Sequence, residues 1–228
     1  MAYTFQFGPL AAYLAQFVSG LTLTVLLSFV GIFGGFVVGI FCAVASTSPS
    51  KILRLAVRIY VEAMRNTPLL VQIFVIFFGL PNIGLRMSPF TSVLIALVLN
   101  NGGYIAEIVR GGIQSTHRSQ FEAAESLGMT YFQTLRFVVL PPALEKVFTP
   151  IVSQCVLLML STSLVSAIGV EDLTGAAMVA SSETFRTMEV YLVIAAVYLS
   201  LNFVFRGVLN AAGLMIFRRS RRQLLRRI

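Results

Sequence analysis

Residues 1–50 of the chain contain no charged side chain, and within them an apolar run extends from about Phe17 to Ala45. About 20 consecutive apolar residues are enough for an α-helix to cross the hydrocarbon core of a bilayer. No basic residue precedes this run, and the run is longer than the apolar core of a cleaved signal, so we expect it to remain in the mature protein. The N-terminal part of the chain therefore predicts a membrane-spanning helix.

Further apolar stretches lie near residues 69–80, 90–109, 148–170 and 191–217. The stretch at 69–80 is short, and it can span only if its helix begins near Tyr60 and accepts Glu62 and Arg65 close to the lipid headgroups. Of the 228 residues, 57% are hydrophobic and 11% charged, which is too apolar for a water-facing domain of this size. We predict an all-α membrane protein with about five transmembrane helices, and the ends of the second helix stay open.

The positions of Lys and Arg predict the orientation, because basic loops stay in the cytoplasm. Basic residues gather between the first and second helices, between the third and fourth, and in the tail 218–228, whereas the connection 171–189 is net acidic. We expect an N-terminus outside, a cytoplasmic C-terminus and a location in the bacterial inner membrane. The pI of about 10.1 also fits a nucleic-acid-binding protein. Because a basic tail beside anionic lipid is usual in such a membrane protein, we expect membrane lipid and no nucleic acid as a partner.

Groups for catalysis are sparse in the sequence. Cys42 and Cys155 are isolated within apolar runs, which is typical of packing residues. His117 is the only histidine, so the chain offers no histidine cluster for zinc and no obvious base for a catalytic triad. No G-x-x-x-x-G-K-[ST] phosphate loop occurs, so any ATP and Mg must be bound by another chain. We expect no catalytic residue, metal or cofactor in this chain.

Two capping boxes lie in the cytoplasmic loop of about residues 115–145. Ser119 with Glu122, and Thr130 with Gln133, each fit the S/T-x-x-E/Q pattern in which the first side chain caps the start of a helix and the fourth reaches back. Each box predicts a helix that begins there.

The end of each of these two helices is also marked. Gly128 fits the left-handed residue that ends the first helix, and Pro141-Pro142 should prevent the second from continuing far past Leu140. The loop should form a helix-turn-helix elbow between the third and fourth transmembrane helices. With small Ala123 and Ala124 on its first arm, it could enter a groove of another protein. The alternative is an amphipathic helix that lies on the membrane.

Three motifs resemble one transporter family. Glu122-Ala123-Ala124, followed by Gly128 and Leu140-Pro141, resembles the E-A-A, G and I/L-P loop of ABC importer permeases. Residues 65–72, RNTPLLVQ, resemble the R-x-T-P-L-L-V-Q of the polar amino acid branch, and residues 104–113, YIAEIVRGGI, resemble its A-Y-x-A-E-x-x-R-G-G-I. The resemblance covers roughly residues 21–213. The chain is identified as a member of the polar amino acid (His/Glu/Gln/Arg/opine type) permease family of binding-protein-dependent transport.

The resemblance implies a single transmembrane permease domain over residues 1–228, with a core of about 17–217. In that family two permeases pair, each docks its elbow, the coupling helix, onto an ABC ATPase, and a soluble binding protein delivers the substrate from outside. The implied partners are therefore an ABC ATPase dimer that binds ATP and Mg, a second permease in a homo- or heterodimer, and a soluble amino acid-binding protein. The residues carried over to ATPase coupling are Ser119, Glu122, Ala123, Ala124, Gly128 and Pro141.

Polar side chains on the third helix mark a candidate substrate pathway. Asn100, Tyr104 and Glu107 are spaced i, i+4 and i+7, which places them on one stripe. An ionisable group within a span usually faces a partner, a cavity or a pathway, so Glu107 is a candidate to meet a substrate ammonium group. An ion pair with Arg110 at i+3 is the alternative.

The fourth helix adds Gln154, Ser161 and Thr162 to the candidate pathway. Their polar groups can bond a zwitterion, but hydroxyls within a helix can equally bond carbonyls of the preceding turn. The resembling family usually has K-D/N-T-S-L here, whereas this chain has LSTSL at residues 160–164. The missing carboxylate weakens the case for a basic amino acid as substrate.

Small residues and one proline predict how the helices meet. Gly31, Gly35 and Gly39 form a stripe that lets another backbone approach closely, either in the same chain or in a second permease. Thr67-Pro68 fits a helix start with proline at the first position, which supports a break before the second span.

Other functions remain open on the sequence alone. A permease for another small nutrient, such as methionine or an opine, would carry the same coupling loop. A membrane scaffold without a pathway would also lack catalytic groups, although the polar stripe of the third helix argues against it. A membrane-embedded enzyme is the weakest alternative, because one histidine and scattered carboxylates do not assemble a nucleophile, base and metal.

Overall fold

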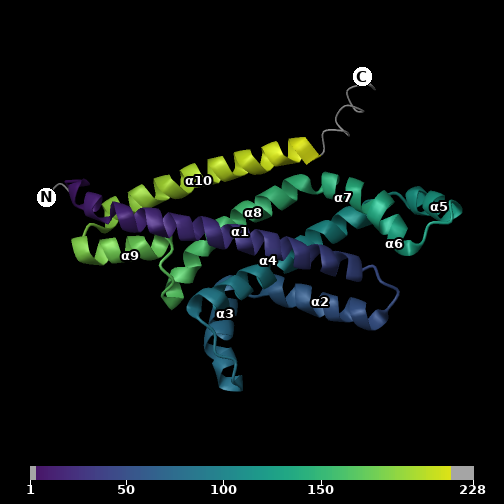
Figure 1. Ribbon diagram of the computed structural model, residues 1–228, viewed down its shortest axis with the longest axis horizontal. Helices are drawn as coiled ribbons and strands as arrows, with labels where there is room; N and C mark the ends of the chain where they lie inside the picture. Colours follow the sequence, from purple (N-terminus) through teal and green to yellow (C-terminus); the bar gives the residue numbers. More distant parts are fainter. Residues whose placement is uncertain (1–3, 217–228) are drawn as a thin grey trace.

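A computed structural model describes residues 4–216, and Figure 1 shows long helices that lie roughly side by side. Helices long and apolar enough to cross a membrane occur at four places in this part of the chain, and a bent pair provides a fifth. The four are α1 Leu14–Ala45 with the preceding 3-10 turn η1 Gly8–Tyr13, α4 Pro89–Gln114, α8 Phe148–Ser161 with η5 Thr162–Ile168, and α10 Thr187–Ile216. The prediction of an all-α protein with about five spans is confirmed. The basic tail 218–228 lies outside the described residues.

The second span is a bent pair of helices. α2 Lys51–Asn66 and α3 Leu69–Phe74 meet at 111°, and α3 continues through the turns η2 Val75–Gly79 and η3 Leu80–Ile83. Thr67 between them is extended, with φ −119° and ψ 141°, because the ring of the following proline disfavours the helical conformation.

The expected limits of this span need correction. The helix begins at Lys51 instead of near Tyr60, because Ser50 caps it there by accepting a hydrogen bond from the Leu53 N–H. Pro68 is the N-cap of α3 and not its first helical residue. The break therefore lies inside the span.

α1 packs along α4 of the same chain through its glycine stripe, and the two helices lie together at the centre of Figure 1. A Cβ placed at Gly35 would lie 2.6 Å from the Asn101 side chain, and one at Gly39 would lie 2.6 Å from Ile105. At Gly31 the added Cβ would lie 3.2 Å from the Leu97 Cβ. The neighbour of the glycine stripe is thus α4, and the absence of side chains lets the backbones approach.

A further helix, α9 Leu173–Thr184, occupies the acidic connection before α10 and was not predicted. Its N-cap is the buried Asp172, whose Oδ1 accepts a hydrogen bond of 2.9 Å from the Gly175 N–H. Burial raises the pKa of the Asp172 carboxyl, and hydrogen bonds from Gly175 and the Tyr198 hydroxyl oppose that rise. In the sequence, an Asp before a run of small residues could have indicated the start of α9.

The loop after α4 folds into the expected helix-turn-helix elbow. α5 Arg118–Ser126 ends in Gly128, whose φ is 72°, and the Met129 N–H donates back to Ala124 O at 3.1 Å. α6 Tyr131–Gln133 then begins with the predicted capping box of Thr130 and Gln133. Local chemistry therefore produces both the turn and the start of the second arm.

The predicted box of Ser119 and Glu122 is wrong. α5 begins two residues earlier, with His117 in place of Ser119 as its N-cap, and no side chain caps it. The Ser119 Oγ lies 2.9 Å from the His117 Nδ1, and the Glu122 carboxylate lies 2.9 Å from the Arg118 Nε. These two pairs engage the Ser119 hydroxyl and the Glu122 carboxylate, which are the groups that the capping box would need.

The second arm also continues past the two prolines, contrary to the expected stop. After α6 the chain forms a π-helical segment, η4 Thr134–Val139, and then α7 Leu140–Lys146. Pro141 and Pro142 occupy the first turn of α7, where the missing N–H groups break no intrahelical hydrogen bond.

Replacement of Gly35 by Ala tests the packing of α1 on α4. The added methyl group must displace Asn101, so Gly35→Ala should destabilise the protein by about 1–3 kcal/mol. Gly207→Ala in α10 is the matched control, because nothing lies within 4 Å of its added Cβ. A lower apparent melting temperature of the detergent-purified protein is expected for Gly35→Ala only. Equal melting temperatures for both variants would contradict the packing account.

Candidate functional site

A cavity of about 250 Å³ with a mixed lining, which we call the polar cavity after the amides and hydroxyls in its wall, lies where the break of the bent pair meets α4 and α8. It is lined by Thr67, Pro68, Leu69, Asn100, Tyr104, Gln154, Leu157, Leu158 and Ser161. Four of the six predicted pathway residues therefore share one cavity, although they come from two helices. Glu107 and Thr162 do not line it.

Asn100 holds α4 against the break. Its Nδ2 donates to Gln72 Oε1 at 3.1 Å and to Met64 O at 3.3 Å. The Nε2 of Gln72 donates to Thr67 Oγ1 at 2.7 Å and to the carbonyls of Thr67 and Met64 at 3.0 Å. These bonds satisfy carbonyls that the bent helix leaves free, which a membrane interior requires. The network fixes one wall of the cavity.

Gln154 connects three spans. Its Nε2 lies 3.4 Å from Asn101 Oδ1, and the Asn101 Nδ2 lies 3.4 Å from the Gly31 carbonyl of α1. Asn101 is fully buried. The amide of Gln154 thus both borders the cavity and supports the packing of α1, α4 and α8.

The hydroxyls at the end of α8 bond to their own helix. Ser161 Oγ donates to Leu157 O at 2.8 Å, and Thr162 Oγ1 donates to Met159 O at 2.7 Å. Thr162 is fully buried away from the cavity, whereas Ser161 reaches its wall. Of these two hydroxyl residues, Ser161 is the one exposed to an occupant of the cavity.

Glu107 lies among positive charges. Its carboxylate accepts hydrogen bonds of 2.9 and 2.5 Å from Arg110, and Arg65 Nη1 lies 3.7 Å away. Arg65 also stacks 5.9 Å from the ring centroid of Tyr104, a cavity residue. The carboxylate is thus neutralised from its own helix and from α2, and this cluster borders the cavity at Tyr104.

Sequence analysis missed three residues of the site, namely Thr67, Gln72 and Asn101. Thr67 and Gln72 lie inside the motif RNTPLLVQ, on either side of Pro68. A hydroxyl and an amide beside a proline could have indicated that these side chains belong to the site. Asn101 directly follows Asn100, but its partners lie on α1 and α8 and depend on how the helices pack.

The elbow extends beyond the ends of the long helices in Figure 1. Most of its predicted coupling residues are exposed, namely Ser119, Glu122, Ala123, Gly128 and Pro141. Ala124 is 3% exposed and packs inside the elbow, where α5 lies on η4. Leu127, at the turn, is 81% exposed, so the tip presents a large apolar side chain.

Hydrogen bonds tie the elbow to the transmembrane helices. The Tyr131 hydroxyl donates to the carbonyl of Thr47, just after α1, at 2.6 Å. Lys146 Nζ donates to the carbonyl of Ser115, at the end of α4, at 2.9 Å. Apolar spans, a polar cavity between them and an attached elbow define a membrane transport protein.

Comparison with known proteins agrees with that class. Residues 35–213 match the family described as binding-protein-dependent transport system inner membrane component. The chain is 36% identical over 196 residues to the probable amino-acid ABC transporter permease protein YckA of Bacillus subtilis, covering 85% of this chain and 87% of that protein. It is 34% identical to the glutamine transport system permease protein GlnP of Escherichia coli K12, covering 85% and 89% of the two chains.

A solved structure is similar over nearly its whole length. It is a crystal structure of an amino acid ABC transporter with histidines, with a TM-score of 0.84 and 36% identity, covering 92% of this chain and 99% of that one. The chain therefore belongs to the family of binding-protein-dependent transport system inner membrane components.

Replacement of Gln72 by Ala tests the network at the break. It removes the donor to the Thr67 carbonyl and the Gln72 acceptor of the Asn100 amide, and it leaves Asn100 as the only side-chain donor to the Met64 carbonyl, which should cost about 1–3 kcal/mol of stability. Gln114→Ala is the control, because Gln114 is an exposed residue at the end of α4. The apparent melting temperature in detergent should fall for Gln72→Ala alone. An unchanged value for Gln72→Ala would show that the network does not hold the break.

Proposed function

We propose that this chain is the membrane-spanning subunit of an ATP-driven importer for polar amino acids. One observation carries the proposal, namely the exposed elbow of α5 and α6, which is bonded through Tyr131 to Thr47 just after α1 and continues into α7, whose Lys146 is bonded to the end of α4. The names of the relatives support the cargo class, since YckA is described as a probable amino-acid permease and GlnP as a glutamine permease.

The elbow offers a route for force to reach the pathway. An ATPase bound at Glu122, Ala123 and the exposed Leu127 would move α5 as it closes and opens. Lys146, at the end of α7, links the helical arm that follows α5 to the end of α4, the helix that carries Asn100 and Tyr104. A displacement of the elbow would therefore change the walls of the cavity.

The cavity suits a small zwitterion. Amide groups of Asn100 and Gln154 and the hydroxyls of Tyr104 and Ser161 supply both donors and acceptors around it. Glu107 can meet a substrate ammonium group only after it exchanges Arg65 or Arg110 for the substrate. The proposed pathway thus runs from the cavity past this ion-paired cluster.

The complete transporter would need several other chains. An ABC ATPase dimer would bind ATP and Mg, a second permease would complete the pathway, and a soluble amino acid-binding protein would deliver the cargo. In this arrangement the elbow faces the cytoplasm, the N-terminus lies outside the bacterial inner membrane and the C-terminus lies inside. The basic loops on the side of the elbow support this orientation.

Affinity purification of the tagged chain from detergent-solubilised native membranes tests the proposal. Mass spectrometry should identify an ABC ATPase among the co-purifying proteins, with a second permease or a second copy of this chain. An amino acid-binding protein in the same preparation would support the cargo class. If no ATPase is recovered under conditions that preserve a known importer from the same membranes, the coupling proposal fails.

Replacement of Gly128 by Val tests the elbow as the coupling element. A β-branched residue at φ 72° is strained by about 1–2 kcal/mol, which should distort the turn and reduce amino acid uptake relative to ATP hydrolysis. Gly128→Asn should retain more uptake, because Asn tolerates this conformation. The measurement is substrate-driven uptake and ATPase activity of the reconstituted complex.

Gly84→Val is a matched control for this variant. Gly84 also has a positive φ, 87°, and open space around an added Cβ, but it lies in the loop between α3 and α4. It should therefore preserve the ratio of uptake to ATP hydrolysis. The elbow has no coupling role if Gly128→Val keeps the same ratio as the wild type.

A further inference from the structure

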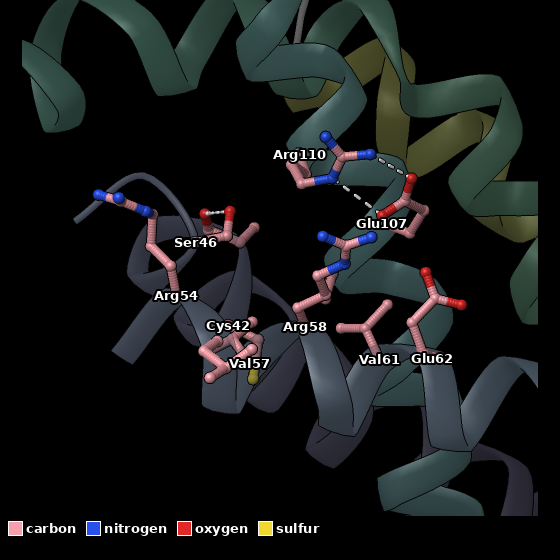
Figure 2. Close-up of a pocket in the computed structure, with 12 residues that line it drawn as sticks. Cys42, Ser46, Arg54, Val57, Arg58, Val61, Glu62, Glu107 and Arg110 are labelled. Atoms are coloured by element: carbon pink, nitrogen blue, oxygen red, sulfur yellow. Dashed lines mark hydrogen bonds and ion pairs between the residues drawn. The ribbon is translucent and has the colours of Figure 1, made fainter. Parts of the chain in front are cut away.

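A second and larger cavity, of about 580 Å³, lies between α1, α2 and α4, near the end of the molecule that carries the elbow. Its apolar lining includes Cys42, Ala43, Leu55, Val57, Val61 and Ala106, and its polar lining includes Ser46, Arg54, Arg58, Glu62, Glu107 and Arg110. Figure 2 shows Arg54, Arg58 and Glu62 along α2, with Arg110 and Glu107 across from them. The cavity thus combines an apolar floor with a rim of guanidinium groups.

The charges of the rim do not cancel. Glu107 is neutralised by the two hydrogen bonds from Arg110. Glu62 accepts a hydrogen bond of 2.7 Å from the Asn66 amide, which brings no charge. The negative charge of Glu62 offsets one of the two remaining arginines, so Arg54 and Arg58 leave the rim with one net positive charge.

The guanidinium groups of α2 have donors to spare. Arg54 uses only its Nη1, on the carbonyls of Ser48 and Pro49 at 2.7 and 3.2 Å. Each guanidinium has five N–H donors. Within residues 4–216, the Arg58 guanidinium makes no hydrogen bond or ion pair. An anion with several oxygen atoms can therefore be bound without breaking the Arg110–Glu107 pair.

The outer face of α2 next to these arginines is apolar. Ile52, Leu55 and Ile59 are spaced i, i+3 and i+7 and are 83%, 59% and 61% exposed. Leu55 also lines the cavity, so apolar surface is continuous from the floor to the outside of the helix. A ligand with an anionic head and long apolar chains matches both surfaces, whereas a free phosphate ion would use only the rim.

We propose that this cavity binds the phosphate headgroup of an anionic phospholipid, with Arg54 and Arg58 on the phosphate and the acyl chains along Ile52, Leu55 and Ile59. Basic cavities between membrane helices are a recurrent site for anionic headgroups. The site is a different cavity from the one at the break, and it shares Glu107 and Arg110 with the ion-paired cluster of the proposed pathway. It places a lipid against α2 and α4, beside the Glu107 cluster.

Lipid retention by the purified complex tests the proposal. The tagged chain, purified with its co-expressed partners, is equilibrated in detergent with equimolar phosphatidylglycerol and phosphatidylcholine, and bound lipid is quantified by mass spectrometry. Wild-type protein should retain phosphatidylglycerol preferentially. Arg54→Gln and Arg58→Gln should each weaken this retention by about fivefold, whereas Arg58→Lys should preserve most of it.

Arg206→Gln provides the matched control, because Arg206 is an exposed arginine of α10 outside the cavity. This variant should retain phosphatidylglycerol as the wild type does. Equal retention of the two lipids by the wild type, or equal loss in Arg206→Gln and Arg58→Gln, would overturn the proposal. Displacement of the lipid by inorganic phosphate alone would assign the rim to a free anion instead and overturn the lipid assignment.

Discussion

The close approach of α1 to α4 is the contact on which the other helices depend. Inside a bilayer, apolar side chains gain little by leaving lipid for protein, so helices associate through close packing and interhelical hydrogen bonds. Gly35 and Gly39 provide the first, because their missing Cβ atoms leave room for Asn101 and Ile105. Asn101 provides the second by reaching the Gly31 carbonyl. The rotation of α4 that results turns Asn100 and Tyr104 toward the break in the second span.

The polar cavity exists because that break is stabilised. A proline inside a span frees backbone carbonyls, and lipid offers them no donor. Gln72 supplies donors to Thr67 and Met64 and accepts one from Asn100, so the bent segment is held to α4. The same groups that satisfy the backbone also create a polar surface beside α8. The residues that stabilise the break are thus also residues of the proposed pathway, so a substitution among them should affect both the stability of the break and the pathway.

Arginine side chains have different roles at the two cavities. Arg65 and Arg110 neutralise Glu107 beside the polar cavity, and in the proposed pathway the carboxylate would exchange one of these arginines for a substrate ammonium group. Arg54 and Arg58 lie one and two turns into α2 and line the larger cavity, with the Arg54 guanidinium bonded to the carbonyls of Ser48 and Pro49. A lipid bound there would contact the helix that leads into the break, so the membrane itself would take part in positioning the pathway.

Local patterns in the sequence determined much of this protein. Hydropathy located α1, α4, α8 and α10, because length and apolarity alone decide whether a helix can span, and glycine stereochemistry located the turn at Gly128. Packing decided the remainder, because the partner of a buried amide or carboxylate depends on how neighbouring helices are rotated. Asn101 meets residues about 50 and 70 positions away, and Glu107 meets an arginine of α2. The break at Pro68 was visible in the sequence, but the donors that satisfy the carbonyls around it depend on how Gln72 and Asn100 are packed.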